Sequence, residues 1–449
     1  MAAPTHLSLG DRGQRIGLRL ITKVGSLPML GNPDVRRTVE SLLYRGSRSA
    51  FGTIEAIEAM EAASRRSFPS RAGRGDPART AVAPARREFD LTPSDDQDLI
   101  RSAAAGLADD VIRPAAARAD AERSVPGAVR RAAAELGLTL LGVPSELGGI
   151  AEERSAVTAA LVLEELARGD LGIATALLAP AAVATALANY GSSTQQATYL
   201  PAFTSESVPA RASLALMEQG PLFDPLSPTT TAAIRGSDLV INGAKSLVVG
   251  AADADLLIIS ALVDGAPRLV LVEAGTRGIT VADDPAMGIR AACTGRIALD
   301  DAVVPAANLL GTSEDHLDAV RRARLAWSAA ACGTAQAVLD QLIPYVTTRE
   351  AFGEPIAHRQ AVAFTVADIA IELAGLRLVV WRAASQLDQG KDAARLVAHA
   401  RHLTARHAAQ IGSHAVQLLG GHGFVKEFDN ERWYRDLRGA GVLEGVLLT

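Results

Sequence analysis

The sequence predicts an α+β fold in which two helical domains flank a small β domain. Three observations support this prediction: helical periodicity up to about residue 207, short β-branched runs between about residues 213 and 304, and long apolar-periodic segments after Gly311. We therefore expect an N-terminal helical domain (91–210), a middle β-barrel or sandwich domain (211–311) and a C-terminal four-helix bundle (312–449). Residues 1–90 are expected to form an N-terminal extension.

The extension has helical patterns around Val35–Leu43 and Ile54–Ala63. It then continues through Ser67–Arg87, which is rich in Pro, Gly, Ala and Arg and lacks an apolar period. This composition predicts a flexible linker. The extension is net basic, so a docking or membrane-surface role stays open beside that of a solvated tail.

The folded body is expected to begin at Thr92-Pro93-Ser94-Asp95, with Thr92 as the helix cap and Pro93 in the first turn. Glycines such as Gly137, Gly169 and Gly191 separate the helices that follow. The expected helices are Leu99–Ile112, Pro126–Leu136, Ala156–Arg168 and Ile173–Ala188.

In the middle domain, Asn242-Gly243 and Asp264-Gly265 predict hairpin turns, because such turns require positive φ angles. The clearest strands are Leu256–Ile259 and Leu269–Val272.

The C-terminal domain opens with a capping box at Thr312 and Asp315. The expected helices run from there towards Tyr345, from Gln360 to Leu387 and from Ala393 to Leu419. Long helices with short connections predict an antiparallel bundle.

Composition excludes several classes of protein. A hydrophobic share of 48% with 21% charged residues is that of a folded globular protein. We find no stretch that approaches the ~20 continuous apolar residues of a membrane helix, and no secretory signal. The two cysteines exclude a disulfide framework and indicate a reducing, cytoplasmic setting. A net charge of −5 gives no reason to expect nucleic acid as a binding partner.

Common catalytic motifs are absent: we find no phosphate-binding glycine loop, no G-x-S-x-G and no zinc-type spacing. One helix carries His399, His402, His407 and His414. These histidines do not share one face and no carboxylate has a fitting spacing, so we interpret them as packing residues and expect no metal site.

Six stretches resemble the acyl-CoA dehydrogenase family in that family's order, covering about residues 95–446. They include Glu135-Leu136-Gly137-Leu138 with Val143–Gly149, Glu164–Asp170, Asn242–Lys245, Met287–Arg290 with Asn308–Gly311, Arg349–Gly353, and Glu431–Asp436 with Glu444-Gly445. The resemblance implies an FAD-dependent oxidoreductase of fatty acid and lipid metabolism that acts on acyl-CoA.

The resemblance also implies cofactor-binding residues. Arg349, Phe352 and Gln360 match "RxxFGxxxxxxQ", which in the family holds the adenine and pyrophosphate of FAD across a subunit interface. An arginine suits this task because its planar fork binds a diphosphate through two hydrogen bonds. The other expected contacts are Gln417, Gly420 and Gly421 in a second FAD loop, and Met217 and Val249 beside the flavin.

The sequence departs from the family beside the flavin. Leu247 replaces the usual Trp, Val249 replaces a Thr that bonds flavin N5, and the loop after Met217 lacks its Ser. After Glu444-Gly445 the family's Thr is Val446. These changes bear on FAD affinity and turnover more than on the fold.

Glu444 matches the family's catalytic base, the Glu before Gly in "YEGT". Some members carry the base on an earlier helix, next to an arginine that corresponds to Arg324, but that position is Ala323 here. Arg324 is expected to contribute to substrate binding. Dehydrogenation of a thioester requires a base for the α-proton and an acceptor for the β-hydride, and a carboxylate in a desolvated pocket gains basicity.

Alternative functions remain open at this point. The chain could be an inactive subunit that supports a related partner in a hetero-oligomer, or an oxidase or monooxygenase on the same scaffold. Expected partners of the dehydrogenase are acyl-CoA, an electron-transferring flavoprotein, and further subunits in a homodimer, homotetramer or heterotetramer.

Overall fold

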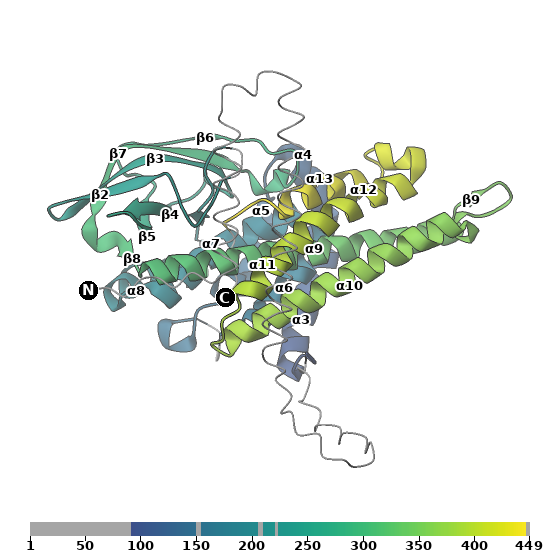
Figure 1. Ribbon diagram of the computed structural model, residues 1–449, viewed down its shortest axis with the longest axis horizontal. Helices are drawn as coiled ribbons and strands as arrows, with labels where there is room; N and C mark the ends of the chain where they lie inside the picture. Colours follow the sequence, from purple (N-terminus) through teal and green to yellow (C-terminus); the bar gives the residue numbers. More distant parts are fainter. Residues whose placement is uncertain (1–90, 150–153, 205–209, 221–222, 446–449) are drawn as a thin grey trace, which may run out of the picture. The chain divides into compact units, whose positions relative to one another are not determined.

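The computed structural model describes residues 91–149, 154–204, 210–220 and 223–445. The predictions for residues 1–90 and for Val446 lie outside this range. From Pro93 onward the described residues belong to one compact unit. Helices come first, strands next and helices last (Figure 1), so the predicted α+β class is confirmed.

The N-terminal helical region begins with a capping box in which Ser94 and Gln97 exchange side-chain and backbone hydrogen bonds. The predicted cap at Thr92 is therefore wrong: the helix begins at Asp95, and Ser94 places its hydroxyl on the N–H of the third helical residue. The α-helices are α3 (Asp95–Leu107), α4 (Arg113–Glu122), α5 (Gly127–Glu135), α6 (Ala156–Gly169), α7 (Leu171–Tyr190) and α8 (Ser193–Tyr199). The shorter turns are η2 (Ala108–Ile112), η3 (Leu138–Leu140), η4 (Ser145–Leu147) and η5 (Leu200–Phe203).

Helix α7 is apolar on all sides. By length and composition it is the one described helix that could cross a membrane, which corrects the expectation that no stretch approaches this limit. Within the protein, however, 94% of its most apolar window is buried. It is packed as the core helix of a globular unit.

The middle region is a single eight-stranded sheet, with the path β6-β7-β3-β2-β4-β5-β8 and β1 paired in parallel with β4. Its strands are β1 (Ala212–Ala215), β2 (Thr231–Arg235), β3 (Asp238–Val248), β4 (Leu256–Val263), β5 (Ala266–Glu273), β6 (Ile279–Asp283), β7 (Gly295–Pro305) and β8 (Leu309–Leu310). The 3₁₀ turns η6 (Arg290–Ala292) and η7 (Ala306–Asn308) flank β7.

One of the two predicted hairpin turns is correct. Asp264 and Gly265, with φ of 49° and 77°, connect β4 to β5. Asn242-Gly243 instead lies inside β3, where the pairing with β7 shifts register between Ile241 and Gly243. The prediction of a turn there is wrong because the side chain of Asn242 bridges to Asp301 on β7, which continues the pairing past the irregularity.

The C-terminal region is a helical bundle. Its helices are α9 (Ser313–Thr348), α10 (Gln360–Asp388), α11 (Ala394–Leu403), α12 (Ala409–Leu418) and α13 (Asn430–Ala440), and its short turns are η8 (Ile356–His358), η9 (Thr404–Ala408) and η10 (Gly420–Phe424). The capping box at Thr312 and Asp315 is confirmed. The predicted helix from Ala393 to Leu419 is interrupted by the π-helical turn η9. In Figure 1, α9 and α10 run side by side to the hairpin of β9 (Glu350–Ala351) and β10 (Glu354–Pro355).

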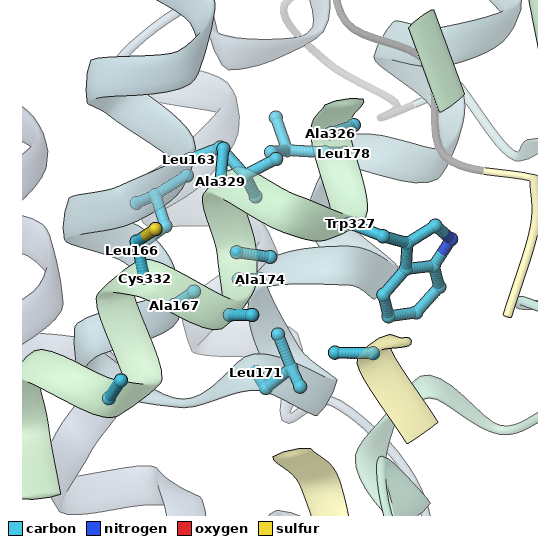
Figure 2. Packing of buried hydrophobic residues seen from close by; sticks show 14 of the residues in the cluster. Leu163, Leu166, Ala167, Leu171, Ala174, Leu178, Ala326, Trp327, Ala329 and Cys332 are labelled. Atoms are coloured by element: carbon cyan, nitrogen blue, oxygen red, sulfur yellow. The ribbon is translucent and has the colours of Figure 1, made fainter. Parts of the chain in front are cut away.

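The core that positions α9 combines large apolar side chains with small residues of α9. Figure 2 shows Leu163 and Leu166 of α6 packed near Cys332 of α9, while Trp327 projects from the opposite side of α9. A Cβ at Gly333 would lie 1.9 Å from the carbonyl oxygen of Glu164, so only glycine permits this approach between α9 and α6.

Helix α13 joins the three regions through buried charges. The guanidinium of Arg435 binds both carboxylate oxygens of Asp120 on α4, at 2.9 and 3.0 Å. Arg432 donates to Asp170 at the start of α7, at 3.0 Å. Asp436 accepts the N–H of Ile289 in the middle region at 2.5 Å. Side chains from one helix thus tie together segments that are far apart in the chain.

Candidate active site

Glu444 lies in the short segment that follows α13 and is 5% exposed. Its Oε1 atom accepts a hydrogen bond from Nε of Arg324 on α9 at 3.1 Å, and a second from Nη2 of Arg401 on α11 at 3.3 Å. Its Oε2 atom is also buried and has no hydrogen-bond partner among the described residues. A buried carboxylate is costly unless it is paired, and the two guanidinium groups supply that pairing.

Of these two arginines, sequence reasoning predicted only Arg324. Arg401 is 8% exposed, and burial lowers the pKa of its guanidinium to about 10, so it is still charged at neutral pH. A second bond runs from its Nη1 atom to the carbonyl oxygen of Ala440 at 3.0 Å. No local pattern separates Arg401 from the other arginines of the chain; its burial together with its contact to Glu444 identifies it.

Gly445 brings the Glu444 segment against the middle region. Its φ of 106° favours glycine, and a Cβ at this position would lie 2.7 Å from the carbonyl oxygen of Leu214 in β1. The chain continues from the end of β1 to Met217 within two residues. The loop that starts at Met217 therefore begins close to the segment after α13 that carries Glu444.

The two residues predicted to lie beside the flavin are both anchored to the sheet. The carbonyl oxygen of Met217 accepts from the N–H of Ser246 at 3.0 Å. Val249 is buried, and its carbonyl accepts from the hydroxyl of Ser213 on β1 at 2.6 Å. Ser213 is the neighbour of Leu214, whose carbonyl oxygen lies against Gly445. The structure therefore gathers this half of the predicted site next to the Glu444 segment.

The other predicted cofactor residues lie in a different place. Arg349, Gln417, Gly420 and Gly421 line a cavity of about 350 Å³ together with Tyr345 and His422. The hydroxyl of Tyr345 lies 3.0 Å from Nδ1 of His422. From Arg324 to the end of α9, where this cavity lies, the helix rises about 36 Å. Within one chain these are two separate sites.

Phe352 and Gln360 do not line that cavity. Phe352 is 96% exposed in the turn between β9 and β10, with the guanidinium of Arg359 5.6 Å from its ring centre. Gln360 is exposed as the first residue of α10. Among the described residues no group of three His, Cys, Asp or Glu side chains is placed to hold a metal ion.

Three parts of the chain resemble known protein domains. Residues 94–207, 213–302 and 316–447 match, in turn, the sequence profiles of the acyl-CoA dehydrogenase N-terminal, middle and C-terminal domains. The fold and these matches define an oxidoreductase that acts on CH–CH groups. The chain belongs to the acyl-CoA dehydrogenase family, which is FAD-dependent.

Individual relatives differ in the reaction that their names describe. The chain is 31% identical over 365 residues to the mitochondrial short-chain specific acyl-CoA dehydrogenase of Rattus norvegicus, covering 78% of this chain and 86% of that protein. It is 30% identical over 373 residues to acryloyl-CoA reductase (NADH) of Anaerotignum propionicum, covering 80% and 93%. The solved structure of PigA with FAD and proline has a TM-score of 0.72 and 26% identity, covering 79% and 95%.

Proposed function

We propose that this protein dehydrogenates an acyl-CoA thioester at Cα–Cβ, with Glu444 as the base that takes the α-proton. The observation that carries the proposal is the asymmetry of the Glu444 carboxylate. Oε1 is held by two guanidinium groups, whereas Oε2 is buried without a partner among the described residues. One oxygen is fixed and the other is left to accept a proton, as general base catalysis requires.

The residues of the chain fit the cofactor of the family. Arg349 and Gln417 offer a charged fork and an amide to the cavity at the end of α9, which suits the diphosphate and adenine of FAD. A Cβ at Gly420 or Gly421 would meet nothing within 4 Å, so both leave space for a ligand at the backbone. Met217 and Val249 would pack beside the flavin, which supplies the hydride acceptor for the β-hydrogen.

Further subunits complete the proposed site. The exposed Phe352 and Gln360 match cofactor contacts that act across a subunit interface in the family, so we infer a homodimer, homotetramer or heterotetramer. An electron-transferring flavoprotein is the proposed acceptor. A cytoplasmic location is proposed because both cysteines, Cys293 and Cys332, are free thiols.

The test is a spectrum of the purified protein followed by anaerobic addition of a panel of acyl-CoAs. We expect a flavin band that bleaches with one member of the panel. Glu444→Gln should keep the band and slow its bleaching by about 10²–10⁴-fold, because the proton acceptor is gone. The matched control is Glu427→Gln, an exposed carboxylate before α13, which should bleach at the wild-type rate. Wild-type bleaching in Glu444→Gln would refute the assignment of the base.

A second candidate is an inactive subunit that supports a related chain. It is favoured by the aliphatic side chains of Leu247 and Val249, where the family has a Trp and a Thr beside the flavin. In this case the chain produced alone would show no flavin band even when FAD is supplied, and it would co-purify with a related chain.

A further inference from the structure

Arg401 stands out among the buried charged residues because it contacts two atoms of the segment that carries the base. Its Nη2 atom lies 3.3 Å from Oε1 of Glu444, and its Nη1 atom donates to the carbonyl of Ala440 at 3.0 Å. Ala440 is the last residue of α13, where helix carbonyls lack partners within the helix. One guanidinium thus caps α13 and binds the carboxylate four residues later.

We propose that Arg401 is the positioning residue of the catalytic base: it fixes the carboxylate of Glu444 relative to α13 so that Oε2 faces the substrate. This inference rests on the proposed function of Glu444. Arg324 reaches Oε1 from α9, and Arg401 reaches the same oxygen from α11. Two donors from different helices restrict the rotation of the carboxylate more than either donor alone.

The chemistry of the guanidinium suits this task. Arginine presents several N–H donors in a rigid plane, so one group holds a backbone carbonyl and a carboxylate at a fixed mutual orientation. A lysine supplies the positive charge from a flexible stem and does not reproduce the planar geometry. We therefore expect Arg401→Lys to restore charge but only part of the orientation.

The experiment compares Arg401→Met and Arg401→Lys with Arg406→Met, an exposed arginine in η9. Flavin bleaching is followed anaerobically with ordinary and α-deuterated acyl-CoA. Arg401→Met should lower the rate at saturating substrate by about 100-fold, because a misplaced base costs about this much, with KM nearly unchanged. It should also raise the α-deuterium isotope effect, since proton abstraction becomes slower. Arg401→Lys should recover part of the rate, and Arg406→Met should match the wild type.

A second measurement does not depend on activity. Thermal unfolding of Arg401→Met, Glu444→Gln and the double variant forms a cycle that reports direct coupling between the two side chains. We expect the decrease in Tm of the double variant to be smaller than the sum of the decreases of the two single variants. Additive losses would overturn the inference.

The outcomes separate the inference from the proposed function. If Arg401→Met bleaches with the wild-type rate and isotope effect while Glu444→Gln is slow, Arg401 only caps α13 and the base assignment stands. If Glu444→Gln itself bleaches at the wild-type rate, the proposed base is wrong, and the positioning role of Arg401 falls with it.

Discussion

At the scale of single residues, the most buried ion pair of the described residues lies directly after Met217. Nζ of Lys245 is 2.7 Å from Oε1 of Glu218, and the side chains are 0% and 2% exposed. Burial alone would raise the pKa of Glu218, but attraction to Lys245 and hydrogen bonds from Thr229 and Thr230 outweigh it and lower the pKa to about 2. This pair fixes the end of β1 against β3, and with it the Met217 loop.

Because of the Glu218–Lys245 pair, we expect the free energy of unfolding to decrease in acid. Because the folded-state pKa of Glu218 is depressed from 4.5 to about 2, its contribution is complete above pH 4.5 and is lost as the pH falls towards 2. The contribution is at most about 3 kcal/mol. Chemical denaturation between pH 2 and 6 should show a shallower pH dependence for Glu218→Gln/Lys245→Met than for the wild type. Glu314→Gln, at an exposed carboxylate, is the control; equal slopes in all three proteins would contradict the prediction.

The candidate site was only partly predictable at this scale. Glu444 and Arg324 could be identified because each lies in or beside a motif that resembles the family. Arg401 could not, since it is one of 41 arginines and its role depends on which helix face becomes buried. Arginines are usually exposed, so burial of this kind follows from tertiary packing and not from local sequence.

At the scale of elements, Gly243 permits the close approach of β3 to Thr230, at the end of its antiparallel pairing with β2. Its φ is 145°, and a Cβ there would lie 2.7 Å from Oγ1 and 2.8 Å from Cα of Thr230, just before β2. Gly243→Ala should therefore lower the free energy of unfolding by about 3 kcal/mol, through backbone strain and overpacking together.

The matched control for this variant is Gly265→Ala in the β4–β5 turn. Gly265 also has a positive φ, of 77°, but a Cβ there would meet nothing within 4 Å. Gly265→Ala should lower the free energy of unfolding by about 1–2 kcal/mol, from backbone strain alone. Denaturant titrations that gave the two variants equal losses would show that the contact with Thr230 is unimportant.

The two glycines also explain why one hairpin prediction succeeded and the other failed. Both follow Asn or Asp, and both have positive φ angles, so the dipeptides are equivalent as local signals. At Asn242-Gly243, β3 pairs with β7 on both sides of the dipeptide, so the chain forms a strand irregularity there and not a hairpin turn. Only the long-range partner distinguishes a turn from a bulge.

At the scale of the whole molecule, α10 presents an apolar row to its surroundings. Phe364, Ile371 and Leu378 are 58%, 68% and 54% exposed and are spaced seven residues apart, so they lie on one face of the helix. The row begins near the end of α10 that carries Gln360. An exposed apolar surface of this kind is typical of a protein–protein interface.

Phe364→Asp/Ile371→Asp should give a smaller species in light scattering and should lose bound FAD, because the proposed cofactor contacts from a second subunit separate. The control is Ile234→Asp on β2, another exposed aliphatic residue, which should leave both mass and flavin content unchanged. An unchanged mass for the α10 variant would exclude this face as the subunit interface.

The overall order of the fold could be predicted because each region has its own periodicity. Helical spacing dominates before Thr204 and after Gly311, and alternation with turn residues dominates between them. What could not be predicted is how the regions meet. The contacts of α13 with α4, α7 and the middle region join residues more than a hundred positions apart, and no local pattern records such distances.

The charged junction around α13 also limits how such chains can be recombined. Asp120, Asp170 and Asp436 each bind a group from another region. A chimera whose N-terminal helical region lacked a carboxylate at the position of Asp120 or Asp170 would leave Arg435 or Arg432 buried without that partner, at a cost of several kcal/mol. A chimera made by domain exchange should therefore be more stable when both parent chains supply the matching side chains of this junction.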